Sequence, residues 1–70
     1  MNHHITLNEE AFNELKNGKQ YLFTKRQTTF AAGDILNVTL EGHREQVAFT
    51  INKIVTEKIF QSHCLLELTK

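Results

Sequence analysis

The stretch Asn17–Arg26, NGKQYLFTKR, decides how this chain is organised. Glycine, here Gly18, is the residue that most often ends a helix by adopting the left-handed conformation. The run Tyr21–Arg26 after it has the composition of a strand, with Lys19 before it and two basic residues at its far end. Strand alternation puts on one face Tyr21, Phe23 and Lys25, and on the other Leu22, Thr24 and Arg26. The stretch therefore predicts a helix end followed by a strand with basic residues at both ends.

Upstream, the sequence predicts a short strand and a helix. His3–Leu7 alternates weakly between apolar and polar residues. Asn8 can cap the helix that follows, and the two glutamates after it suit the positive end of the helix dipole. Because Lys16 falls in the last turn before the glycine, the helix is expected over residues 9–16.

Downstream, three further strands are expected. Gly33 and Asp34 form the turn into a strand in which Leu36, Val38 and Leu40 alternate with polar residues, and Gly33 is expected at positive φ. The remaining segments are a hairpin turn at Glu41–Arg44, a strand at Gln46–Val55, a loop or one helical turn at Thr56–His63, and a strand at Cys64–Leu68. The predicted core comprises Leu7, Phe12, Leu15, Leu22, Phe30, Leu36, Val38, Val47, Phe49, Ile51, Leu66 and Leu68.

Seventy residues give a single domain, residues 1–70, with room for one core. The order of one strand, one helix and four strands predicts an α+β, mostly β fold. Short antiparallel strands that lay flat would expose an apolar face. A small β-barrel of about five strands is therefore favoured, with the helix between the first and second strands and over one opening. A two-layer α+β sandwich is the alternative.

Composition and charge exclude several classes of protein. Eight basic residues balance eight acidic ones, which argues against nucleic-acid binding through net charge but leaves a local basic patch open. Cys64 is the only cysteine, so no intrachain disulfide forms and a cytoplasmic location is expected. No apolar run is long enough to span a bilayer or to form a signal-peptide core.

The run GKQYLFTKR from Gly18 to Arg26, followed by FAAGDILNV from Phe30 to Val38, resembles the ASCH domains of the PUA-like superfamily. It is most similar to a short family of unknown function that phages and mobile elements often carry. The resemblance covers about residues 3–40 with recognisable motifs, and only the strand pattern agrees in the rest of the chain. It implies a PUA-like barrel, and RNA is a common ligand of PUA-like domains.

Two departures from the family pattern bear on chemistry. Some ASCH relatives are amidases that act on acylated cytidine and use a lysine and a threonine in the site. Gln20 stands where the family has that lysine, and Phe23 stands where it has an acidic residue or threonine. The resemblance therefore disfavours a nucleoside amidase, and no catalytic residue is expected.

A group of basic and aromatic residues is the best candidate for a ligand site. Its members are Lys16, Lys19, Tyr21, Lys25, Arg26 and His43. Cations can bind phosphates, while Tyr21 or His43 can stack on a base. Because Lys25 and Arg26 lie on opposite faces of the strand, at most three of the cations can converge. The alternative is a set of solvated charges at a helix end and a strand end.

Other reactive side chains have simpler structural explanations. The four histidines are interpreted as surface groups, since adjacent His3 and His4 point to opposite faces and no spacing matches a metal site. No metal or cofactor is expected. Cys64 has the parity of the apolar residues in its strand, which predicts a buried, inert thiol. Asp34 is expected to accept hydrogen bonds from turn N–H groups.

These patterns predict a binding domain, with RNA or a nucleotide-like ligand contacted by Lys19, Lys25 and Arg26. The rival is a structural or protein-interaction module whose sheet edge pairs with another chain. Under either interpretation we expect a monomer or weak dimer without membrane association.

Overall fold

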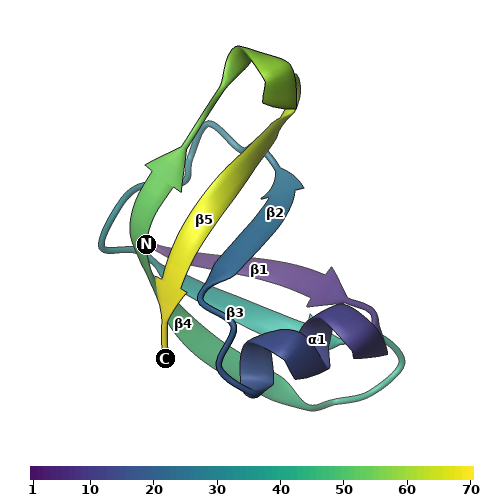
Figure 1. Ribbon diagram of the computed structural model, residues 1–70. Coiled ribbons are helices and arrows are strands. Elements are labelled where there is room, and N and C mark those ends of the chain that lie inside the picture. Colours follow the sequence, from purple (N-terminus) through teal and green to yellow (C-terminus); the bar gives the residue numbers. More distant parts are fainter.

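The computed structural model describes residues 1–70 as a coiled β-sheet with one α-helix (Figure 1). The elements are, in order, β1 (Asn2–Leu7), α1 (Glu9–Lys16), β2 (Tyr21–Lys25), β3 (Ile35–Leu40), β4 (Gln46–Val55), η1 (Lys58–Phe60) and β5 (His63–Thr69). α1 and β4 have the predicted bounds, β1 and β2 differ from prediction by one residue at one end, and β5 is longer than predicted by one residue at each end. The segment 56–63 contains η1, a single 3₁₀ turn. The chain is therefore an α+β, mostly β domain, as predicted.

Both ends of α1 are fixed by residues that the sequence analysis had singled out. The Asn8 side chain accepts a hydrogen bond from the Ala11 N–H at 2.9 Å. At the other end Gly18 has a φ of 114°, and the Lys19 N–H donates to the Glu14 carbonyl at 3.0 Å. This turn leads the chain directly into β2, and α1 lies beside the C-terminal ends of β1 and β3 (Figure 1).

The five strands form one sheet in the order β1-β3-β4-β5-β2. The pairs β3–β4, β4–β5 and β5–β2 are antiparallel as expected, whereas β1 pairs with β3 in parallel. The expectation of a wholly antiparallel sheet is wrong for β1, because α1, β2 and the following loop make a connection long enough to return the chain in the same direction. β1 and β2 are not paired with each other, so they are the two edges of an open sheet.

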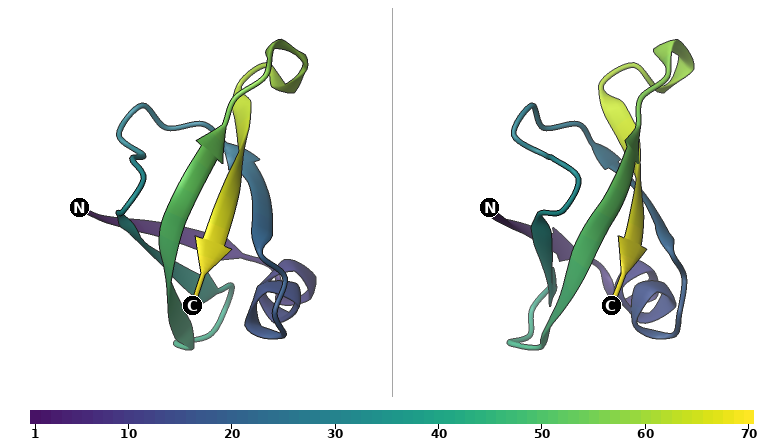
Figure 2. Two further views of the ribbon diagram at one scale, coloured as in Figure 1. Left: turned by 60° about the vertical axis from the view of Figure 1, so that its left-hand side comes forward. Right: turned by 90° about the vertical axis from the view of Figure 1, so that its left-hand side faces the viewer.

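β4 is the strand about which the sheet turns. Its first half pairs with β3, and its second half, from Thr50 to Val55, pairs with β5. The register shifts between Ile51 and Lys53, which marks a bulge where the strand bends. As a result, β1 and β3 run at a steep angle to β5 and β2 (Figure 1, Figure 2).

The core lies between the concave side of this sheet and the inner face of α1. The buried residues are Phe12, Leu15, Leu22, Phe30, Leu36, Val38, Leu40, Phe49, Ile51, Cys64, Leu66 and Leu68. Of the predicted core residues, Leu7 and Val47 are only partly buried, and Leu40 is buried in addition to those predicted. On β2 only Leu22 is buried, so this strand gives one face to the core and the other to solvent.

Candidate functional site

The basic residues singled out by the sequence lie at the two ends of β2. Lys19 precedes β2 and lines a pocket with Lys16 at the end of α1, whereas Lys25 and Arg26 lie at the far end of the strand. The chain between Lys19 and Lys25 spans roughly 20 Å when extended. The structure therefore brings Lys16 and Lys19 together and separates them from Lys25 and Arg26.

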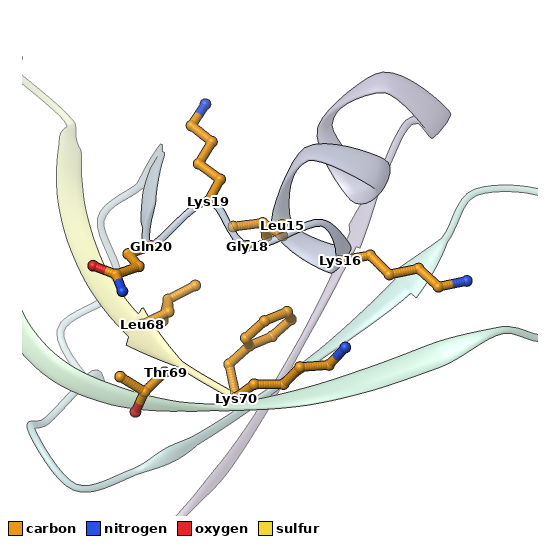
Figure 3. Close-up of a pocket in the computed structure, with 9 residues that line it drawn as sticks. Leu15, Lys16, Gly18, Lys19, Gln20, Leu68, Thr69 and Lys70 are labelled. Carbon is orange, nitrogen blue, oxygen red and sulfur yellow. The ribbon is translucent and has the colours of Figure 1, made fainter.

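The pocket opens between the end of α1 and the last residues of β5 (Figure 3). Its volume is about 180 Å³, and it is lined by Leu15, Lys16, Gly18, Lys19, Gln20, Phe49, Leu68, Thr69 and Lys70. Three of these residues are hydrophobic and three are lysines. The arrangement is an apolar floor with cations around its rim.

Two of the three lysines that line this pocket have carboxylate partners. The Lys16 ammonium group contacts the Glu45 carboxylate, and Lys19 Nζ lies 3.5 Å from Glu14 Oε2. Lys16 and Lys19 also extend in different directions from the pocket (Figure 3). Because small-molecule sites have volumes of about 300–1,000 Å³, this pocket suits only a smaller ligand, and the charges of Lys16 and Lys19 are balanced by their partners.

At the far end of β2, Lys25 and Arg26 lie on opposite sides of the sheet. Lys25 pairs with His63 across the β2–β5 ladder. The Arg26 N–H donates to the Ser62 carbonyl at 2.7 Å, so the ladder continues one residue beyond the strand. Burial raises the pKa of the Cys64 thiol, and the positive charge of Arg26 opposes this rise. Strand alternation puts Arg26 on the Cys64 side of the sheet, away from Lys25.

The face of β4, β5 and β2 opposite the core carries exposed aromatic residues, and we call it the outer face. It comprises Tyr21, Phe23, Lys25, Lys53, Val55, His63, Leu65 and Glu67. The cross-strand rows are Lys53–Glu67–Tyr21, then Val55–Leu65–Phe23, then His63–Lys25. The exposed fraction is 47% for Tyr21 and 52% for Phe23. An apolar row is thus flanked on both sides by a row that contains a lysine.

Phe23 lies at the centre of the outer face and is held in one orientation. Its ring stacks on His63 with centroids 5.1 Å apart and an interplanar angle of 7°. The ring of Phe60 in η1 meets it edge-on, also at 5.1 Å. Strand alternation placed Phe23 on the face opposite Leu22, a predicted core residue, but the sequence analysis gave Phe23 no binding role. The contacts with His63 and Phe60 join segments distant in sequence, and no local signal reveals them.

His43 lies apart from the outer face. It is in the hairpin between β3 and β4, where its N–H donates to the Leu40 carbonyl at 3.0 Å and its side chain is exposed. This hairpin is at the end of the molecule near α1 (Figure 1). The structure therefore does not bring His43 to Lys25 or Arg26.

A partly buried histidine–aspartate pair joins β1 to the residue before β3. The expectation that all histidines are at the surface is wrong for His3, which is 7% exposed; its Nε2 lies 2.7 Å from Asp34 Oδ2. Asp34 also accepts a hydrogen bond from the Met1 amino group at 3.2 Å. Its carboxylate therefore binds these groups rather than the turn N–H groups expected. The hydrogen bond from His3 holds the pKa of Asp34 below its ordinary value.

The groups around the His3–Asp34 pair indicate a structural role. The His3 ring packs edge-on against Phe30, with centroids 4.9 Å apart. No serine, threonine or cysteine side chain hydrogen-bonds to His3, so the pair lacks the nucleophile of a hydrolytic triad. The parallel pairing of β1 with β3 produces this contact, and the sequence analysis did not anticipate it.

The remaining reactive groups are Cys64 and the histidine and acidic side chains outside the His3–Asp34 pair. Cys64 is fully buried, as predicted. No group of three or more histidine, cysteine or acidic side chains is placed to hold a metal ion.

No helix has the length and apolar character needed to cross a membrane. Comparison with protein-family models and with curated proteins finds no match to this chain.

Proposed function

We propose that this domain binds single-stranded RNA on the outer face and leaves it chemically unchanged. The observation that carries the proposal is the exposure of Tyr21 and Phe23 beside Lys25 on one face of β2. Proteins bind single strands by stacking bases on aromatic rings and by contacting phosphates with nearby cations. The outer face offers both kinds of group.

Phe23 is the ring on which a base would stack. His63 covers one side of it and Phe60 contacts it edge-on, so the ring is ordered before a ligand arrives. Order that exists before binding reduces the entropy lost on association. Tyr21 lies two residues away on the same face, roughly 7 Å along the strand, so two successive bases have a ring each.

Lys25 and Lys53 are the cations on the outer face that phosphates would contact. Lys25 ends β2, and Lys53 lies in the same cross-strand row as Tyr21. Glu67 sits between Lys53 and Tyr21 in that row and lowers the local positive charge. With so few cations we expect weak binding, and a slope of log affinity against log salt of roughly −2 for a single strand.

The proposal includes no catalysis. Gln20 lines the pocket at the position where ASCH amidases have a lysine, and none of the nine lining residues is a carboxylate, an imidazole or a thiol. General acid–base catalysis needs a titratable group positioned to move a proton, and the only such side chains in the lining are three lysines, two of which contact carboxylates. Hydrolysis of acetylcytidine is therefore not expected, and detecting it would overturn the proposal.

We further propose that the chain is a small ASCH-like member of the PUA-like superfamily, working in the cytoplasm, in which the barrel is open between β1 and β2. Three features support this. The helix lies between β1 and β2, Gly18 ends it at positive φ, and buried Phe30 precedes the Gly33 turn. Each of these lies in a motif on which the resemblance depends.

Titration of a short labelled single-stranded RNA at two salt concentrations tests the RNA proposal. Phe23→Leu keeps an apolar side chain but removes the ring. We expect affinity to fall roughly tenfold or more, since stacking of one base contributes about 1–3 kcal/mol. Lys25→Gln should weaken binding and make the salt slope shallower by about 0.7.

Arg44→Gln is the matched control. Arg44 is exposed in the β3–β4 hairpin, so this variant removes one positive charge away from the outer face. Its affinity should equal that of the wild type. Equal losses of RNA affinity in Arg44→Gln and Lys25→Gln would indicate binding by charge alone. If no RNA binds at low salt, the protein-interaction alternative becomes the favoured function.

A further inference from the structure

We propose that two copies of this chain associate through the open edge of β2, with a two-fold axis at Phe23. The proposal goes beyond RNA binding and does not depend on it. RNA would contact side chains of the outer face, whereas the second copy would pair with backbone groups along the edge of the strand.

The outward edge of β2 carries unpaired backbone groups. On the inward edge, the Leu68 N–H donates to the Gln20 carbonyl and the Arg26 N–H donates to the Ser62 carbonyl, both at 2.7 Å. In an antiparallel pair, residues that bond to the partner strand alternate with residues whose N–H and C=O groups point away from it. The residues whose backbone groups point outward are therefore Tyr21, Phe23 and Lys25.

Nothing in the fold covers this edge. β5 is the only strand bonded to β2, and no segment runs along the other side of β2 in any of the three views (Figure 1, Figure 2). The chain has no proline, and the β2–β5 register is unbroken, so neither a proline nor a bulge blunts the edge. Monomeric proteins usually protect exposed edges by such means. Lys25 is the only charged side chain within β2.

The other edge of the sheet is less suited to pairing. β1 exposes three polar side chains, those of Asn2, His4 and Thr6. β2 instead exposes two aromatic rings and the stem of a lysine. Burial of apolar surface drives association, so β2 is the edge that gains more from a partner strand.

An antiparallel pairing centred on Phe23 is self-complementary. Phe23 then lies opposite Phe23 of the second copy, and Tyr21 lies opposite Lys25 of the second copy. All three outward residues take part, with about six new backbone hydrogen bonds. Aromatic pairs, and an ammonium group beside an aromatic ring, are favourable across strands. The same patch serves both copies, as a two-fold interface requires.

Charge favours this register over two of the alternatives. A pairing centred on Lys25 would place two lysines opposite each other, and one centred on Leu22 would place Lys25 opposite Lys19. Centred on Phe23, Lys25 lies opposite Tyr21, which has Glu67 as its neighbour on the other side. The formal net charge of zero also removes long-range repulsion between copies.

Edge pairing leaves the outer-face side chains in place. The apolar row Val55–Leu65–Phe23 would continue into the same row of the second copy. The two outer faces would then form one surface. A second copy is therefore the occupant that matches this edge in backbone, shape and charge.

Sedimentation velocity over a wide range of protein concentrations, without RNA, is the first test. The apparent mass should rise from that of one chain toward that of two. Amide hydrogen exchange on the same wild-type samples gives the position of the interface. Protection at Tyr21, Phe23 and Lys25 should increase with concentration, while Leu22 and Thr24, bonded to β5, should be protected throughout.

Charge variants at the proposed axis provide the decisive comparison. Phe23→Lys and Phe23→Glu should each be monomeric, because like charges meet at the two-fold, and an equimolar mixture should form the dimer again. Ile59→Lys is the control, since Ile59 is exposed in η1 and off the edge. It should dimerise like the wild type.

Three outcomes would overturn the proposal. These are a wild-type chain that stays monomeric, dimers that persist in Phe23→Lys, and mixtures of the two charge variants that do not associate. The hydrogen-exchange pattern is measured on the wild type, so it decides the question even where a variant folds poorly. A monomeric chain that binds RNA would overturn only the dimer.

Discussion

At the scale of single residues, Gly33 links a turn to the start of a strand pair. Its φ is 93°, and its N–H donates to the Ile51 carbonyl at 2.7 Å. A β-carbon at this position would meet no atom within 4 Å, so a clash is not the issue. We expect Gly33→Ala to lower the free energy of unfolding by about 1–2 kcal/mol through backbone strain alone. Urea unfolding measures this, with Thr28→Ala in the exposed loop as control, and wild-type stability would contradict it.

The Asp34 carboxylate should make stability depend on pH. Its pKa in the folded protein lies below the ordinary value of 3.8, and the hydrogen bond from His3 is the largest cause. A carboxyl group of this kind stabilises the fold above its unfolded pKa, and the contribution is lost as pH falls through the folded pKa. Asp34→Asn should therefore melt below the wild type at neutral pH, and the gap should close below pH 3.8. A gap that is constant across thermal melts from neutral to acidic pH would reject this.

Residues differ in how far the sequence can predict them. The Asn8 cap and the positive φ of Gly18 and Gly33 depend on a few neighbouring residues, and each is predicted correctly. The contact between His3 and Asp34 joins positions 31 residues apart. It exists only because β1 lies parallel to β3, which no local pattern indicates.

At the scale of elements, the two faces of β2 should differ in their effect on stability. Leu22 is 8% exposed on the core side, and Phe23 is 52% exposed on the outer face. Leu22→Ala should lower the free energy of unfolding by about 2–4 kcal/mol. Phe23→Ala should lower it by less than about 1 kcal/mol. A slip of one residue would exchange the two faces, so equal losses on chemical denaturation would show a different register.

Strand faces are predictable where pairing partners are not. Alternation correctly places Leu22 inside and Phe23 outside, because the repeat of two residues is a property of the strand itself. The partner of β2 is β5, the last strand in the chain, and no local pattern in either strand indicates this choice. The aromatic cluster of the outer face depends on the same choice. The candidate site was therefore only partly visible in the sequence.

At the scale of the whole molecule, one cluster of twelve buried residues forms the entire core. Phe49 is central to it, at 4% exposed. It pairs with Leu36 across β3–β4 and lines the pocket with Leu15 and Leu68, so it connects both halves of the sheet with α1. Because no second core exists, the domain should unfold in one cooperative step.

Phe49→Ala should therefore affect the whole domain at once. A domain of this length has a free energy of unfolding of about 4–10 kcal/mol, and removing a buried phenylalanine costs about 3–5 kcal/mol. We expect a large drop in melting temperature, with far-ultraviolet circular dichroism and Tyr21 fluorescence reporting the same midpoint. Thr6→Ala, at an exposed position of β1, is the control and should melt like the wild type. An unchanged melting temperature for Phe49→Ala, or midpoints that differ between the two probes, would mean that the two halves of the sheet do not share one core.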